Sequence, residues 1–363
     1  MKAAICYEFG KPLAIEEVTM NPPGKGEVKV RIAATAICHS DIHSIRGEHG
    51  AAQLPALPGH EVAGHVEEVG DDVTYVQPGD SVVCCLVRAG CGQCYYCITG
   101  LPNFCENRKM EFQRPGPYFN KRGERLTLFA GLFAGFAEYT IAPEDALVKI
   151  PKEMPMDRAA LLACGVISGF GAVVNGAKVK PFSSVVVMGT GGVGLNALQG
   201  AAFVGAHPII AMDVLDSKLK AARVLGATHT LNLKKESNPV DAVKRITYGR
   251  GADYVFVTVA GIAPKRQGFL TLARNGMAIF IGHGMNEYLS DFDAVEFVGG
   301  KMLTGCAMGA TRIRIDIPRL IELYQVGRIK LDELITGRYS LEQINEAIAS
   351  VEKGEALRNV ILF

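Results

Sequence analysis

The chain has 363 residues, of which 48 % are hydrophobic, 21 % are charged and 7 % are aromatic, with no Trp. This balance is typical of a globular α/β protein and excludes a disordered or coiled-coil chain, and the length favours two domains. A formal net charge of +1 without a long basic run argues against nucleic acid or an anionic membrane as the main partner.

The first residues of the chain lack the apolar core of a signal peptide, and no apolar run is long enough to cross a membrane. We therefore expect a cytoplasmic protein. In that reducing setting the ten cysteines are expected to be metal ligands and core thiols rather than a disulfide framework.

Short β runs punctuated by Gly and Pro fill the chain up to about residue 150 and predict an all-β, barrel-like unit. Examples are residues 28–32, 61–69 and 81–87. Within this unit Cys38 lies close to Asp41, and His60 is followed by Glu61. A thiolate and an imidazole beside orienting carboxylates indicate a zinc site. Two protein ligands are too few, so the spacing leaves the remaining ligand open.

Four cysteines follow at intervals of three, three and eight residues, at Cys91, Cys94, Cys97 and Cys105. Four thiolates so close in sequence can surround one tetrahedral ion, which predicts a structural zinc site. An iron–sulfur cluster fits this spacing less well, and disulfides fit a reducing compartment less well. Basic residues follow the lobe, but without a basic stripe and interleaved aromatics a zinc-ribbon-like nucleic-acid-binding protein is a remote alternative.

After about residue 157 the pattern changes to helices that alternate with apolar strands. A buried strand at 184–188 is followed by Gly189-Thr190-Gly191-Gly192-Val193-Gly194, a helix to 203 and a strand that ends at Asp213. Gly189 permits a tight turn, Gly191 lets the backbone approach a pyrophosphate, and Gly194 lets helix and strand pack closely. Asp213 is expected to bind the adenosine ribose and to repel a 2′-phosphate, which favours NAD.

Further strands are predicted near 229–233, 253–257, 277–281 and 302–306, with helices between them at 218–225, 239–248, 264–273 and 293–298. Six strands with helical crossovers predict a doubly wound parallel sheet. About 60 residues remain, too many for a tail and too few for a domain. We expect residues 315–363 to return to the first domain.

Taken together, these motifs closely resemble the zinc-dependent medium-chain dehydrogenase/reductases of alcohol dehydrogenase type. The motifs are Cys38-His39-Ser40-Asp41-Ile42-His43, Gly59-His60-Glu61, the four-cysteine lobe and the Gly-rich turn. The resemblance implies an α/β plus β fold. A GroES-like β-barrel catalytic domain would comprise residues 1–165 and 309–363, with a structural-zinc lobe near 91–105, and a Rossmann NAD-binding domain would comprise 166–308.

The resemblance also implies residue roles. The third ligand of the catalytic zinc would be Cys164, with Glu61 beneath the metal and able to coordinate it transiently, and Asp41 would hold a ring proton of His60. Ser40 and His43 match the family's proton relay. The implied cofactor contacts are His39, Gly189, Gly191, Gly192, Val193, Gly194, Asp213, Lys218, Gly282, His283 and Arg358. Arg358 matches a second pyrophosphate cation, and His39 stands where many relatives have Arg.

The resemblance implies reversible hydride transfer between a primary or secondary alcohol and NAD, assisted by one catalytic and one structural zinc ion per chain. Val87, at a position where relatives often carry an aromatic residue, suggests room for bulky or aromatic alcohols. The alternative is a thiol-dependent formaldehyde dehydrogenase acting on S-hydroxymethyl thiol adducts. A homodimer is favoured, with a homotetramer as the second choice.

Overall fold

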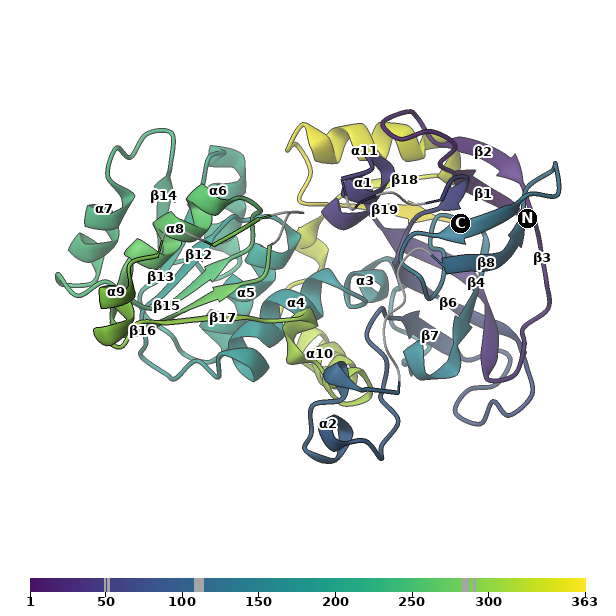
Figure 1. The fold of residues 1–363 in the computed structure, drawn as a ribbon, viewed down its shortest axis with the longest axis horizontal. Coiled ribbons are helices and arrows are strands. Elements are labelled where there is room, and N and C mark those ends of the chain that lie inside the picture. The colour runs from purple at the N-terminus through teal and green to yellow at the C-terminus, as the bar shows by residue number, and fades with distance from the viewer. Residues whose placement is uncertain (49, 51–52, 108–113, 283–286, 290–291) are drawn as a thin grey trace. The chain divides into compact units, whose positions relative to one another are not determined.

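The computed structural model describes residues 1–48, 50, 53–107, 114–282, 287–289 and 292–363, and the chain forms two compact units. The first unit contains Met1–Cys164, Arg312–Val326 and Leu331–Phe363. The second contains Gly165–Thr311 and Gly327–Lys330. Figure 1 shows the ribbon of both units, coloured along the chain.

The first unit is built mainly from antiparallel strands. Its largest sheet has the order β11-β7-β6-β4-β19-β18, and β10 also pairs with β4. The strands of this sheet are β4 (Glu27–Ala36), β6 (Glu61–Val69), β7 (Ser81–Cys84), β10 (Tyr139–Pro143), β11 (Leu147–Lys149), β18 (Ile335–Tyr339) and β19 (Arg358–Leu362). Because β19 pairs with β4, the last strand of the chain completes a sheet begun near its start.

Two smaller sheets and several helices complete the first unit. The strands are β1 (Lys2–Ile5) with β2 (Ala14–Glu17), and β3 (Thr19–Met20), β5 (Ala56–Leu57), β8 (Arg114–Phe119) and β9 (Arg125–Leu128). The α-helices are α1 (His39–Ile45), α2 (Tyr95–Ile98), α3 (Met156–Leu161), α10 (Ile313–Gln325) and α11 (Ile344–Glu352), and 3-10 turns lie at Pro102–Phe104, Glu144–Ala146, Asp332–Leu334 and Leu341–Gln343.

Helix α1 is fixed by its buried face. Ile42 and Ile45, three residues apart on one side of the helix, enter the same apolar core as Ile344 and Ile348 of α11. This packing leaves the other side of α1, which carries the polar residues of the sequence motif, free of the core.

The second unit contains a six-stranded parallel sheet with the order β14-β13-β12-β15-β16-β17. Its strands are β12 (Val185–Met188), β13 (Ile209–Asp213), β14 (His229–Asn232), β15 (Ala252–Val257), β16 (Leu272–Phe280) and β17 (Met302–Gly305). The helices are α4 (Gly165–Gly171), α5 (Gly192–Phe203), α6 (Asp216–Val224), α7 (Pro239–Ile246), α8 (Ile262–Leu270) and α9 (Ala294–Val298), with a π-helical turn at Ala172–Gly176 and a 3-10 turn at Met308–Ala310.

The strand order of this sheet is that of a dinucleotide-binding fold, with its reversal point between β12 and β15. The apolar runs that predicted the strands form the core, in which Val186, Ile210, Val255 and Phe269 are completely buried. The two units confirm the predicted fold class of an α/β parallel sheet together with a mainly antiparallel β unit.

One predicted strand is too long. The run at 81–87 pairs only as far as Cys84, because Cys84 is the last residue in register with β6, opposite Val62, and the chain then turns toward the four-cysteine lobe. Among the described residues, no helix is long and apolar enough to cross a membrane.

Candidate active site and metal centres

Four side chains of the first unit converge on one point. The ligand atoms of Cys38, His60, Glu61 and Cys164 all lie within 4.8 Å of one another. Cys38 is the residue before α1, His60 and Glu61 stand at the start of β6, and Cys164 follows α3. His60, Glu61 and Cys164 are buried. The structure therefore supplies a third ligand that sequence spacing could not.

Asp41 connects two of these ligands. Its Oδ1 accepts a hydrogen bond from Nδ1 of His60 at 2.7 Å and from the Gly59 amide at 3.2 Å, while Oδ2 accepts from the Cys38 amide at 3.1 Å. Asp41 is the third residue of α1, so the last contact is half of a capping box. Because Nδ1 is held by Asp41, Nε2 of His60 is left for the cluster. Ser40 Oγ lies 3.5 Å from that nitrogen.

The groups around the cluster shift the pKa values of its two thiols in opposite directions. Hydrogen bonding to Cys164 lowers the pKa of the Cys38 thiol well below its ordinary value despite its burial, and His60 contributes. The same contact with Cys38, together with burial, raises the pKa of Cys164. Two neighbouring thiolates repel each other, and a bound cation removes that repulsion.

Glu61 and Arg358 form a buried ion pair beside the cluster. The Arg358 guanidinium donates to Oε2 of Glu61, and the two side chains are 5 % and 0 % exposed. Burial raises the pKa of Glu61 to about 7, although Arg358 opposes the shift. Among the described residues, Oε1 of Glu61 and Nε of Arg358 are buried without a hydrogen-bond partner. The sequence did not indicate this ion pair, because Glu61 and Arg358 are 297 residues apart in the chain.

The donor set fits zinc. Two thiols, one imidazole nitrogen and a carboxylate oxygen without a partner are ligands that Zn²⁺ prefers, and three protein ligands leave a coordination position open. Cys38, His60 and Cys164 would hold the ion, and Oε1 of Glu61 is available beside it.

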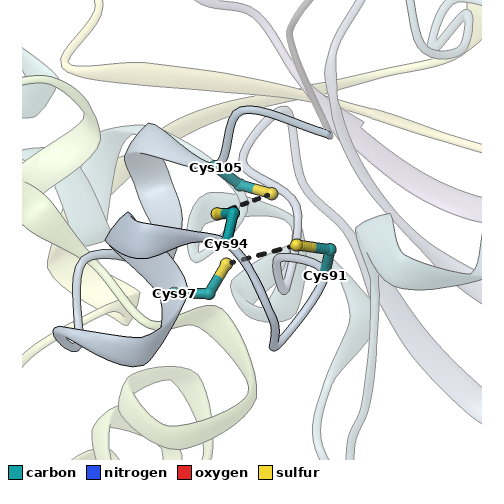
Figure 2. Close-up of side chains that lie close together, drawn as sticks. All are labelled: Cys91, Cys94, Cys97 and Cys105. Carbon is teal, nitrogen blue, oxygen red and sulfur yellow. Dashed lines mark hydrogen bonds between the residues drawn. The ribbon is translucent and has the colours of Figure 1, made fainter.

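The second cluster, shown in Figure 2, is formed by Cys91, Cys94, Cys97 and Cys105 around α2. The Sγ atoms of Cys91 and Cys97 lie 4.0 Å apart, and those of Cys94 and Cys105 lie 3.9 Å apart. Four sulfurs placed 2.3 Å from a tetrahedral zinc ion would be about 3.8 Å apart, whereas a disulfide needs about 2.05 Å. Backbone hydrogen bonding, chiefly from Gln93, lowers the pKa of Cys91 to about 6. This geometry fits a closed structural site.

The two predicted relay residues lie on α1. Ser40 and His43 are three residues apart and share a side of the helix. The His43 side chain is 33 % exposed, and its Nδ1 forms a hydrogen bond with Glu48. His39 is the first residue of α1, and its ring centroid lies 6.4 Å from that of His43. The contact between Glu48 and His43 was not predicted from the sequence. Gly47, which precedes Glu48, was a sequence signal that the chain turns there.

In the second unit, the turn after β12 has the geometry of a phosphate-binding loop. Gly189 has φ +90°, and a Cβ on Gly194 would lie 1.8 Å from the Gly189 carbonyl oxygen, so both positions require glycine. A Cβ on Gly191 would meet nothing within 4 Å, which leaves open space above the backbone there. Gly192 and Val193 begin α5, whose first amides point to that space. These features fit a dinucleotide pyrophosphate.

Asp213 ends β13, as the sequence predicted, but its carboxylate is already hydrogen-bonded. Oδ2 accepts from the amide and hydroxyl of Thr190 at 2.8 and 2.9 Å, and Oδ1 accepts from the amides of Val214 and Leu215 at 2.7 and 3.0 Å. Asp213 therefore joins the Gly-rich turn to the loop after β13. Its contact with ribose remains a prediction.

The remaining predicted cofactor residues have different surroundings. Lys218 is partly exposed on α6. Gly282 follows β16, and a Cβ there would lie 2.5 Å from the backbone of Thr258, so its backbone is closely packed. His283 lies outside the described residues. Arg358, predicted to meet a phosphate, is engaged by Glu61, so that role also remains a prediction.

Comparison with known proteins agrees with this geometry. Residues 24–152 match the family of the alcohol dehydrogenase GroES-like domain, and residues 192–325 match the family of zinc-binding dehydrogenases. The chain is 35 % identical to the NDMA-dependent alcohol dehydrogenase of Amycolatopsis methanolica, over 99 % of this chain and 98 % of that protein. It is 36 % identical to the S-(hydroxymethyl)glutathione dehydrogenase of Paracoccus denitrificans, over 100 % and 99 %.

Among solved structures, benzyl alcohol dehydrogenase from Acinetobacter calcoaceticus superposes with a TM-score of 0.92 at 32 % identity, covering 100 % of this chain and 99 % of that one. These matches give no support to the zinc-ribbon-like nucleic-acid-binding alternative. The chain belongs to the zinc-dependent medium-chain dehydrogenase/reductase family of alcohol dehydrogenase type, and it is an NAD-dependent zinc oxidoreductase.

Proposed function

We propose that this protein transfers a hydride reversibly between a primary or secondary alcohol and NAD, with the aldehyde or ketone as the other product. The observation that carries the proposal is the convergence of Cys38, His60 and Cys164, with Glu61 beside them, in a chain that also has the Gly-rich turn. Zinc bound by the three ligands supplies Lewis acidity toward the alcohol or carbonyl oxygen.

The residues around the cluster then have distinct roles. Asp41 holds Nδ1 of His60 and so fixes the ring and its tautomer. Ser40 and His43 carry the alcohol proton outward, because both lie on the polar side of α1 and His43 is partly exposed. Glu61 is a carboxylate that can approach the metal, and Arg358 balances its charge.

The cofactor contacts are proposed on the geometry of the second unit. The backbone from Gly189 to Gly194 would bind the pyrophosphate, and Asp213 with Lys218 would lie at the adenosine ribose. The proposal also assigns His39 and Arg358 to the phosphates, and Gly282 with His283 to the nicotinamide. NAD is favoured over NADP because the Asp213 carboxylate repels a second phosphate.

The proposed substrates are bulky or aromatic alcohols. Two arguments support them: the family resemblance implies that Val87 stands where relatives often have an aromatic side chain, and the fold superposes on a benzyl alcohol dehydrogenase. A panel of aliphatic and aromatic alcohols should be oxidised with NAD, followed by NADH absorbance, by protein that contains about two zinc ions per chain. Zinc-replete protein that oxidises no alcohol in the panel would refute the proposal.

A second candidate activity is oxidation of S-hydroxymethyl thiol adducts of formaldehyde. It is favoured by the 36 % identity to S-(hydroxymethyl)glutathione dehydrogenase over nearly the whole of both chains. Formaldehyde turnover that requires added glutathione, with little activity on benzyl alcohol, would select this reaction. Equal formaldehyde turnover with and without the thiol would exclude it.

We also propose a homodimer. The support is exposed apolar surface on the second unit. Met302 of the edge strand β17 is 40 % exposed, and Val295 and Val298 of α9 are 66 % and 86 % exposed. Exposed sheet edges and apolar surfaces are often covered by a partner. Light scattering on a size-exclusion column should give twice the chain mass of 38.9 kDa, and a monomer would refute the assignment.

A further inference from the structure

The end of helix α1 places a carboxylate against the proposed relay histidine. Gly47 follows the helix cap Arg46 with φ +77°, a left-handed conformation that favours glycine. The Gly47 amide donates to the Ser44 carbonyl at 3.0 Å, and the Glu48 amide donates to the His43 carbonyl at 2.8 Å. These two bonds form a Schellman motif, which always brings the second residue after the cap over the last turn.

In most such motifs the two residues brought together are apolar, but here they are Glu48 and His43. The Glu48 carboxylate forms a hydrogen bond with Nδ1 of His43. The two side chains are 46 % and 33 % exposed, so the contact lies at the boundary with solvent. Glu48 therefore holds His43 by Nδ1, and Nε2 is the second ring nitrogen.

A cationic side chain, Arg46, also lies near Glu48. Arg46 lies 3.8 Å from Glu48 but only 2.7 Å from Glu352 of α11, so its closer partner is Glu352. On the helix itself, the ring of His39 lies 6.4 Å from that of His43. Among the described residues, the charged and titratable groups of this region include His39 on the helix, Arg46 and Glu48 at its cap, and Glu352 of α11.

We propose that Glu48 is a positioning residue for His43 in proton transfer. Glu48 accepts the Nδ1 hydrogen, which fixes the ring orientation and leaves Nε2 as the acceptor. When Nε2 takes the proton that the relay delivers, the ring becomes an imidazolium, which the adjacent carboxylate stabilises. The imidazolium then gives the proton to water and the neutral ring is restored, so the step involves one proton and no other bond. This inference rests on the relay role given to His43 in the proposed function.

The test compares three variants with the native enzyme. Glu48→Gln keeps an acceptor for Nδ1 but removes the charge, and Glu48→Ala removes both. Glu67→Gln is the matched control, since Glu67 is also 46 % exposed and its ion-pair partner is an arginine, Arg31, at 3.8 Å. All should bind NADH and melt like the native protein.

The expected kinetic result is graded. Oxidation of the best alcohol at neutral pH should fall roughly 3-fold in Glu48→Gln and about 10-fold in Glu48→Ala, mainly in kcat, with a larger solvent deuterium isotope effect. Glu67→Gln should change neither quantity.

A spectroscopic measurement separates positioning from general structural damage. Ring ¹⁵N shifts, with the His43 signals assigned from His43→Gln, should show Nδ1–H in the native protein and in Glu48→Gln. Glu48→Ala should show a mixture of the two tautomers. An unchanged tautomer and rate in Glu48→Ala would overturn the inference.

The two levels of the proposal fail in different ways. If His43→Gln leaves alcohol oxidation and its isotope effect unchanged, His43 is not in the relay and the proposed function loses that step. If His43→Gln is slow but both Glu48 variants match Glu67→Gln, the relay stands and only the role of Glu48 is refuted.

Discussion

Replacing Asp41 with Asn tests how the catalytic metal site is held. The native carboxylate, only 4 % exposed, accepts three hydrogen bonds, from the His60 ring and from the amides of Gly59 and Cys38. An Asn side chain has one acceptor oxygen. If that oxygen serves His60 and Gly59, the side-chain NH₂ group faces the Cys38 amide, donor against donor.

The expected cost is a weaker zinc site rather than an unfolded protein. Loss of a group that orients a histidine ligand typically weakens metal binding roughly 10- to 100-fold, or about 1.4 to 2.7 kcal/mol. The hydrogen bonds of Asp41 are made at the catalytic cluster, so zinc retention by the four-cysteine lobe serves as an internal reference. We expect Asp41→Asn to lose one of its two zinc ions to a chelator at a concentration that leaves the native protein intact.

The assay is zinc content by mass spectrometry after graded chelator treatment, with remaining activity measured in parallel. The control is Asp72→Asn, which alters an exposed ion pair with Lys25. Native-like retention of both ions in Asp41→Asn would contradict the argument, and so would loss of both ions together.

Three further predictions address other parts of the chain. Cys97→Ser should lose the lobe zinc, lower the melting temperature and retain the catalytic zinc, as zinc analysis and calorimetry can show. Gly194→Ala should abolish NADH binding measured by fluorescence titration, because its Cβ would lie 1.8 Å from the Gly189 oxygen. Burial would raise the pKa of Asp157, but hydrogen bonds from Arg158 and Arg338 outweigh it and hold the pKa below its ordinary value. Asp157→Asn should therefore cost about 1–3 kcal/mol in urea unfolding at pH 7. The difference should begin to shrink below about pH 4, the unfolded-state pKa, and should disappear only when the pH falls through the lower pKa of the native carboxyl.

Much of the fold could be predicted because its signals are local. The apolar strand before Gly189, the glycines of the turn and the acidic residue after the next strand specify one βαβ unit through backbone conformation alone. The four-cysteine lobe could also be predicted from the sequence, since its four ligands lie close together in the chain. The predicted strand at 81–87 was too long because apolar composition does not reveal where its neighbour stops pairing.

The active site was predictable in kind but not in its connections. The residue types at Cys38, Asp41 and His60 indicated zinc, but the spacing could not supply Cys164, which only the family resemblance identified. The ion pair between Glu61 and Arg358 joins residues at opposite ends of the chain, and it forms because β19 returns to pair with β4. No periodicity or motif carries that information.

The local features could be predicted from the sequence alone: the metal chemistry of the ligands, the phosphate turn and the succession of strands along the chain. The folded structure was needed to show which distant groups share a site and which acceptors are already occupied. Asp213 illustrates the difference, because its position after β13 was readable from the sequence, but its four hydrogen-bond donors come from two separate loops. The physical reason is that backbone conformation depends on neighbouring residues, whereas hydrogen bonding and burial depend on whatever the folded chain brings within a few ångströms.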